Sequence, residues 1–126
     1  MDEKKLALAA CSGMSPHGLV TRAACSDTVE NSGKIISICM GATSADREGF
    51  RDLIKKYPII AVNGCEGSCV NKILAQKGVE VYARVNVMEI LNKENLTPHN
   101  VSRLDVEGEK CVEVVKMRIK EIMGQQ

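Results

Sequence analysis

Aromatic residues are almost missing from this 126-residue sequence, which has one Phe, two Tyr and no Trp. Proteins that bind bases or sugars by stacking present several aromatic rings, so a surface of that kind is not expected. An excess of charge of one sign is lacking as well, because 17 basic residues are balanced by 16 acidic ones and neither kind forms a long run. We therefore expect neither nucleic acid nor a membrane surface as a partner.

A long hydrophobic segment is also lacking. The apolar run at residues 6–10 is shorter than the core of a signal peptide and far shorter than a membrane span. We therefore expect a cytoplasmic protein, and its length suits a single domain over residues 1–126. Cysteines in a reducing compartment do not normally form structural disulfides, so the six in this chain suggest metal ligation, redox chemistry or a catalytic thiol.

Strand-like and helical patterns alternate along the chain. Strands are expected at residues 5–10, 34–40, 58–62 and 79–85, the last of which alternates apolar and polar residues as an edge strand does. Helices are expected at 16–30, from a capping box at 43–46 to Tyr57, and at 68–77, 86–91 and 110–123. No pattern identifies the structure of residues 96–107. The alternation predicts a three-layer α/β fold of flavodoxin or Rossmann type, whose mostly parallel four-stranded sheet has the order 2-1-3-4 and helices on both faces.

Four of the six cysteines fall where a parallel sheet collects ligands. Cys11, Cys39 and Cys65 each end or follow one of the first three strands, and Cys69 opens the next helix. Ligands of open parallel sheets bind beyond the carboxyl ends of the strands, and adjacent strands lie only ~4.8 Å apart. Four thiolates would complete a tetrahedral zinc site, so zinc is the predicted metal; an iron–sulfur cluster uses the same ligands and remains the alternative.

Other interpretations of the cysteines stay open. Cysteine also packs as a small hydrophobic residue, which is our interpretation of Cys111. Cys25 is expected to be packed or partly exposed and not to be a ligand, and Cys39 fits a strand interior equally well. Cys65 and Cys69 could form a redox dithiol, although three residues separate them instead of the usual two. A module that senses or delivers metal is a further possibility, for which the sequence carries no partner signature.

A cysteine phosphatase or arsenate reductase is a weaker alternative. Such enzymes hold an oxyanion at a helix N-terminus, with an Arg six residues after the nucleophile. That position is His17 after Cys11 and Asn71 after Cys65, so the phosphate-clamping guanidinium is missing. His17 itself suits the polar first turn of a helix better than a role as ligand or acid–base group.

The sequence resembles the DGC domain family of zinc-binding proteins. The resemblance lies in Leu8-Ala9-Ala10-Cys11-Ser12-Gly13, in Cys39, and in Asn63-Gly64-Cys65 followed by Cys69, and it spans most of the chain. The family is named for a central Asp-Gly-Cys and shares candidate chelating cysteines, so the resemblance implies a metal site without implying a reaction. Asn63 stands where that motif has Asp, which leaves the thiols intact but puts in doubt any role of the carboxylate as a hydrogen-bond or proton partner.

Overall fold

A computed structural model describes residues 6–11, 13–64 and 67–124. Its sheet consists of β1 (Leu6–Ala10), β2 (Ile35–Ile38), β3 (Ile59–Asn63) and β4 (Ala83–Asn86). All strand pairs are parallel, and the order is β2-β1-β3-β4, as the sequence predicts. Because every strand runs the same way, all four carboxyl ends lie along one edge of the sheet.

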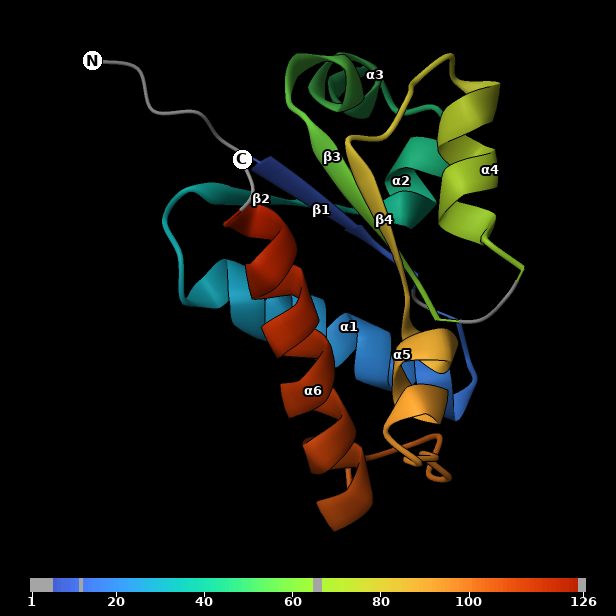
Figure 1. The fold of residues 1–126 in the computed structure, drawn as a ribbon. Coiled ribbons are helices and arrows are strands. Elements are labelled where there is room, and N and C mark those ends of the chain that lie inside the picture. Colours follow the sequence, from blue (N-terminus) through green and yellow to red (C-terminus); the bar gives the residue numbers. More distant parts are fainter. Residues whose placement is uncertain (1–5, 12, 65–66, 125–126) are drawn as a thin grey trace.

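Helices cover both faces of this sheet (Figure 1). On one face lie α1 (Pro16–Glu30), α5 (Val87–Lys93) and α6 (Val106–Met123). On the other lie α2 (Met40–Ser44), α3 (Glu48–Lys56) and α4 (Cys69–Gln76). The predicted three-layer α/β architecture is therefore confirmed. No helix in the described part of the chain is long and apolar enough to cross a membrane.

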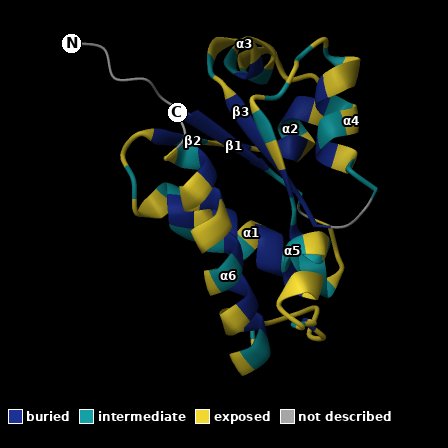
Figure 2. Cartoon of the chain, viewed as in Figure 1, coloured by how far each residue is buried: buried dark blue, intermediate teal, exposed yellow. Residues whose placement is uncertain are grey.

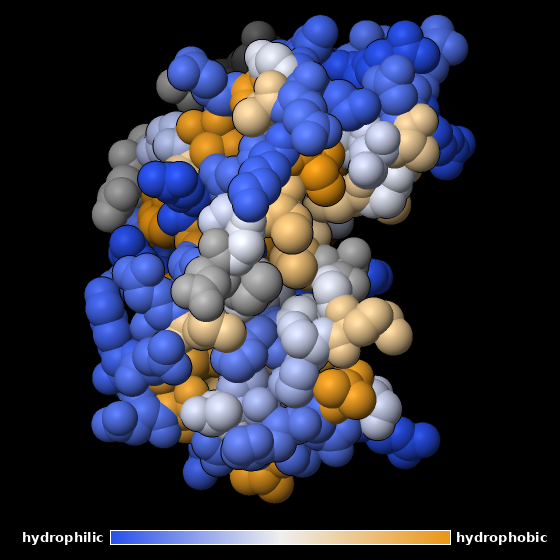
Figure 3. All heavy atoms as spheres, turned by 90° about the vertical axis from the view of Figure 1, so that its right-hand side faces the viewer, coloured by the Kyte–Doolittle hydropathy of each residue, from blue (hydrophilic) through white to orange (hydrophobic). Residues whose placement is uncertain are grey.

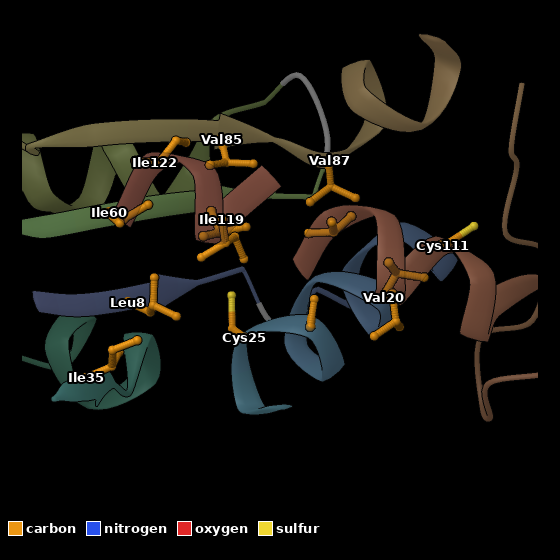
Figure 4. Packing of buried hydrophobic residues seen from close by; sticks show 14 of the residues in the cluster. Leu8, Val20, Cys25, Ile35, Ile60, Val85, Val87, Cys111, Ile119 and Ile122 are labelled. Carbon is orange, nitrogen blue, oxygen red and sulfur yellow. The ribbon is translucent and has the colours of Figure 1, made fainter. Parts of the chain in front are cut away.

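The central strands β1 and β3 are almost entirely buried (Figure 2). The alternation of side chains along the strands divides the core into two clusters. Leu6 and Leu8 point to the face covered by α1 and α6, where Leu8, Ile60 and Val85 lie close to Ile119 and Ile122 (Figure 4). The intervening Ala7 and Ala9 belong to the opposite cluster. Both clusters are almost entirely aliphatic, so each face of the sheet has a core that does not depend on a ligand.

Several predicted boundaries were wrong. The strand expected at 34–40 ends at Ile38, and the single helix expected up to Tyr57 is two helices, α2 and α3. Residues 79–82 are not strand: Val79 and Val81 pack against the α4 side of the sheet, and β4 begins only at Ala83. The capping box expected at 43–46 is absent, because Thr43 lies inside α2 and donates its hydroxyl to the Cys39 carbonyl. The last helix begins at Val106, with the Asp105 carboxylate accepting from the Gly108 N–H at 2.8 Å.

Candidate metal centre

Cys11 lies directly after β1 and still takes part in the sheet. Its N–H donates to the Val62 carbonyl at 2.9 Å, so its backbone position is fixed by the neighbouring strand β3. Its partly buried Sγ accepts from the Gly13 N–H at 3.4 Å, which turns the thiol toward the loop that follows. That loop enters α1 at Ser15, whose hydroxyl accepts from the Gly18 N–H at 3.0 Å and caps the helix as predicted.

Glycines bring this loop against the end of β3. A Cβ on Gly18 would lie 2.2 Å from the Gly13 carbonyl oxygen, so only glycine allows this approach of helix and loop. A Cβ on Gly64 would lie 3.2 Å from the Thr21 hydroxyl and 3.3 Å from the Gly18 nitrogen. Gly64 immediately precedes Cys65 in the sequence. The loop after Cys11 and the residue before Cys65 therefore lie side by side across the first turn of α1.

Cys39 follows β2 and caps α2. Its Sγ accepts from the Ala42 N–H at 3.5 Å, and its side chain is exposed. The register pairs Ala9 with Ile38, which places Cys39 one residue further along the strand pair β1–β2. It is therefore at a strand end, and the alternative interpretation of Cys39 as strand interior was wrong.

Cys69 is the first residue of α4, where its side chain is exposed. The preceding Ser68 has a left-handed backbone (φ 51°, ψ 42°), an uncommon conformation for a non-glycine residue. On the other side, the Val70 N–H donates at 3.1 Å to Oδ1 of Asn63, the last residue of β3. Asn63 Nδ2 in turn donates to Asn71 Oδ1. The start of α4 is thus held to the end of β3 by one buried amide.

The structure places these cysteines along the predicted edge without gathering them into a cluster. Cys11, Cys39 and Cys69 all lie on the side of the sheet where the strands have their carboxyl ends. Cys65 lies outside the described residues. Within residues 6–11, 13–64 and 67–124, no three cysteine, histidine or carboxylate side chains are grouped as they would be around a metal ion. The predicted proximity of the Cys11 and Cys65 sulfurs likewise rests on a residue beyond the described ones.

The remaining two cysteines belong to the core (Figure 4). Burial raises the pKa of the Cys25 thiol to about 12, against a smaller opposing effect of the Arg22 charge. Burial, followed by the negative charges of Glu107 and Asp105, also raises the pKa of Cys111. Both thiols therefore stay protonated at neutral pH, as packing residues rather than ligands should.

The two side chains that stand in place of a phosphatase arginine do not supply its function. Partial burial lowers the pKa of His17, which favours the neutral imidazole. The side chain of Asn71 is engaged by Asn63. Neither residue provides a cation for an oxyanion next to Cys11 or Cys65.

The family model of the DGC domain matches residues 7–117. The chain belongs to the DGC domain family. Comparison with curated proteins and with solved structures gave no significant match. The match of the DGC domain covers all of the cysteines discussed above, together with the strands and helix starts that position them.

Sequence reasoning missed two features of this edge. The first is the Asn63 bridge to α4; its signal is a polar residue ending a strand that is otherwise Ile-Ile-Ala-Val. The second is a cavity of about 220 Å³ that both Cys39 and Arg22 line. No spacing in the sequence indicates that Arg22 and Cys39 line one cavity, because Arg22 belongs to α1 and Cys39 follows β2.

Proposed function

We propose that this DGC domain binds a zinc ion through the thiolates of Cys11, Cys39, Cys65 and Cys69. The observation that carries the proposal is the common position of the three described thiols, each at a strand end or helix start on one edge of the sheet. Cys65 follows β3 by two residues and would add the fourth ligand. Thiolates are suitable zinc ligands, and four of them form a closed site of structural type.

The local contacts are consistent with a site built from loops. Cys11 and Cys39 each accept a backbone N–H group of the loop or helix turn that follows, which fixes the direction of each sulfur at its strand end. Because the described thiols are not clustered, the proposal requires the loops to close around the ion. When bound, zinc would cross-link the ends of strands that backbone hydrogen bonds and core packing already hold together.

Metal analysis of the protein tests this proposal. Chain purified anaerobically without added metal should contain about one zinc per molecule, the content of a single tetrahedral site. Each of Cys11→Ser, Cys39→Ser, Cys65→Ser and Cys69→Ser should lower the zinc content sharply, measured by plasma mass spectrometry. Cys25→Ala and Cys111→Ala, which change core cysteines, should retain it. Full occupancy in all four Ser variants would refute the site, and visible absorbance with bound iron would assign an iron–sulfur cluster instead.

Chelation provides a second measurement. The two aliphatic clusters form a core without the ion, so we expect the metal-free chain to stay folded and to melt at a lower temperature. Far-ultraviolet circular dichroism should therefore be preserved on chelation. An unchanged melting temperature together with unchanged thiol reactivity would argue against any bound metal.

A further inference from the structure

A small cavity lies at the corner of the sheet where β1 and β2 end. Its volume is about 220 Å³. The polar side chains that line it are Arg22 and Ser26 of α1, Ser37 of β2 and Cys39, and apolar groups including Ala10 and Phe50 complete the wall. Cys39 is exposed, so a small molecule in the cavity would lie beside an accessible thiol.

The positively charged group that lines this cavity is the guanidinium of Arg22. One hydrogen bond holds it in place, and its other donors remain available. Arg22 Nε donates to the Ser26 hydroxyl at 3.1 Å, which anchors one side of the guanidinium. Among the residues that the structure describes, no carboxylate lies within ion-pair distance of Arg22. Its terminal nitrogens are therefore available to an external acceptor, and a guanidinium suits the two oxygens of a carboxylate or phosphate.

The two serines add neutral donors beside this charge. Ser26 uses its oxygen as acceptor for Arg22, so its hydroxyl hydrogen remains available. Ser37 is exposed, and the described part of the chain gives its hydroxyl no hydrogen-bond partner. One guanidinium and two hydroxyl groups around a small cavity form a typical set of donors for an oxyanion.

We propose that this cavity is a binding site for a small oxyanion, a carboxylate or phosphate group, which Arg22, Ser26 and Ser37 hold beside Cys39. The site does not depend on a bound metal and goes beyond the proposed zinc function. The sequence has no Arg six residues after Cys11 or Cys65. The fold instead brings the guanidinium of Arg22 to a cavity that a different cysteine, Cys39, lines.

Alkylation of Cys39 in the reduced, metal-free chain tests the site. Iodoacetamide modification of Cys39 and Cys69 is followed by peptide mass spectrometry in sodium phosphate or sodium acetate, with sodium chloride at matched ionic strength as reference. Bound anion should slow alkylation of Cys39 by about threefold or more, because it occupies the same cavity, and should leave Cys69 unchanged. Protection by phosphate alone or acetate alone would support the site and identify the preferred oxyanion.

Two variants and one control assign the effect to these side chains. Arg22→Gln should raise the anion concentration for half-maximal protection by about tenfold or more, since a charged donor is lost. Ser37→Ala, at an exposed position that should not affect folding, should raise it by about threefold. Arg47→Gln, which alters an exposed arginine outside the cavity, should have no effect. The proposal is overturned if neither anion protects Cys39, if Cys69 is protected equally, or if Arg22→Gln and Ser37→Ala both leave protection unchanged.

Discussion

The most direct structural prediction concerns Asn63, a polar residue that is only 3% exposed. Its Oδ1 accepts from the buried Val70 N–H at 3.1 Å, and its Nδ2 donates to Asn71. Asn63→Ala removes both bonds and leaves the Val70 N–H without an acceptor. A buried donor in that state costs about 1–3 kcal/mol, and the lost side-chain volume adds to it. We expect the free energy of unfolding to fall by roughly 2–3 kcal/mol.

Three matched variants separate the parts of this effect. Asn71→Ala removes only the bond between the two amides, at a half-buried position, and should cost about 0.5–1.5 kcal/mol. Asn63→Asp restores the family's Asp-Gly-Cys, keeps the acceptor for Val70 and allows the Asn71 amide to rotate and donate to the carboxylate. It should therefore cost less than Asn63→Ala. Asn92→Ala, at an exposed position of α5, should change stability by less than about 0.5 kcal/mol.

Urea unfolding followed by circular dichroism measures these differences. The reduced protein is treated with chelator first, so that a loss of metal affinity is not mistaken for a loss of intrinsic stability. The reasoning is refuted if Asn63→Ala lies within about 0.5 kcal/mol of the original chain or costs no more than Asn71→Ala. Either result would mean that the Val70 N–H finds another acceptor when Asn63 is shortened.

Two further predictions concern the core and the loop after β1. Gly18→Ala should lower the free energy of unfolding by more than about 2 kcal/mol, because its Cβ would meet the Gly13 oxygen, whereas Gly49→Ala, in open space on α3, should raise it by about 0.5–1 kcal/mol. Equal effects in urea titrations would contradict the close contact. Burial raises the pKa of the Cys25 thiol from 9.0 to about 12. The contribution of the buried thiol to stability is therefore fully present below pH 9 and is lost as the pH rises toward 12, by up to about 1.4 kcal/mol per pH unit. Cys25→Ala should flatten this decline in unfolding measured from pH 8 to 10.5 under reducing conditions, and an unchanged slope would show that other groups cause it.

The strand order and most helices could be predicted because their signals are local and repeated. Four β-strand patterns alternating with helical ones leave few right-handed parallel arrangements. Ser15 before Pro16 and Asn86 before Val87 are caps that the structure retains. These signals need no knowledge of which side chains meet across the fold.

The errors arose where tertiary packing or a hydrogen bond within a helix turn overrides such local patterns. Val79 and Val81 alternate with polar residues as a strand would, but they pack against the α4 side of the sheet without pairing, while Ala83 packs on the opposite side. Thr43 resembles a helix cap in sequence, yet its hydroxyl donates back to the Cys39 carbonyl from inside α2. In both cases the sequence pattern is present, but the structure that it predicted is not.

In the candidate metal centre, too, strand topology determines some features and loops determine others. A parallel sheet places the residues after β1, β2 and β3 on one edge whatever the loops do, so the positions of Cys11 and Cys39 follow from topology. Whether their sulfurs can meet those of Cys65 and Cys69 depends on the segment that follows β3. Before that segment, Asn63 is bonded to Val70 of α4 and Gly64 lies against Gly18 of α1. If the proposed zinc site forms, its metal affinity should therefore be more sensitive to changes of Asn63 and Gly64 than to equally conservative changes within the strands. In the proposed four-thiolate site, a carboxylate at position 63 would keep the bond to Val70 and add a further negative charge, so Asn at this position would reduce the electrostatic repulsion that zinc binding has to offset.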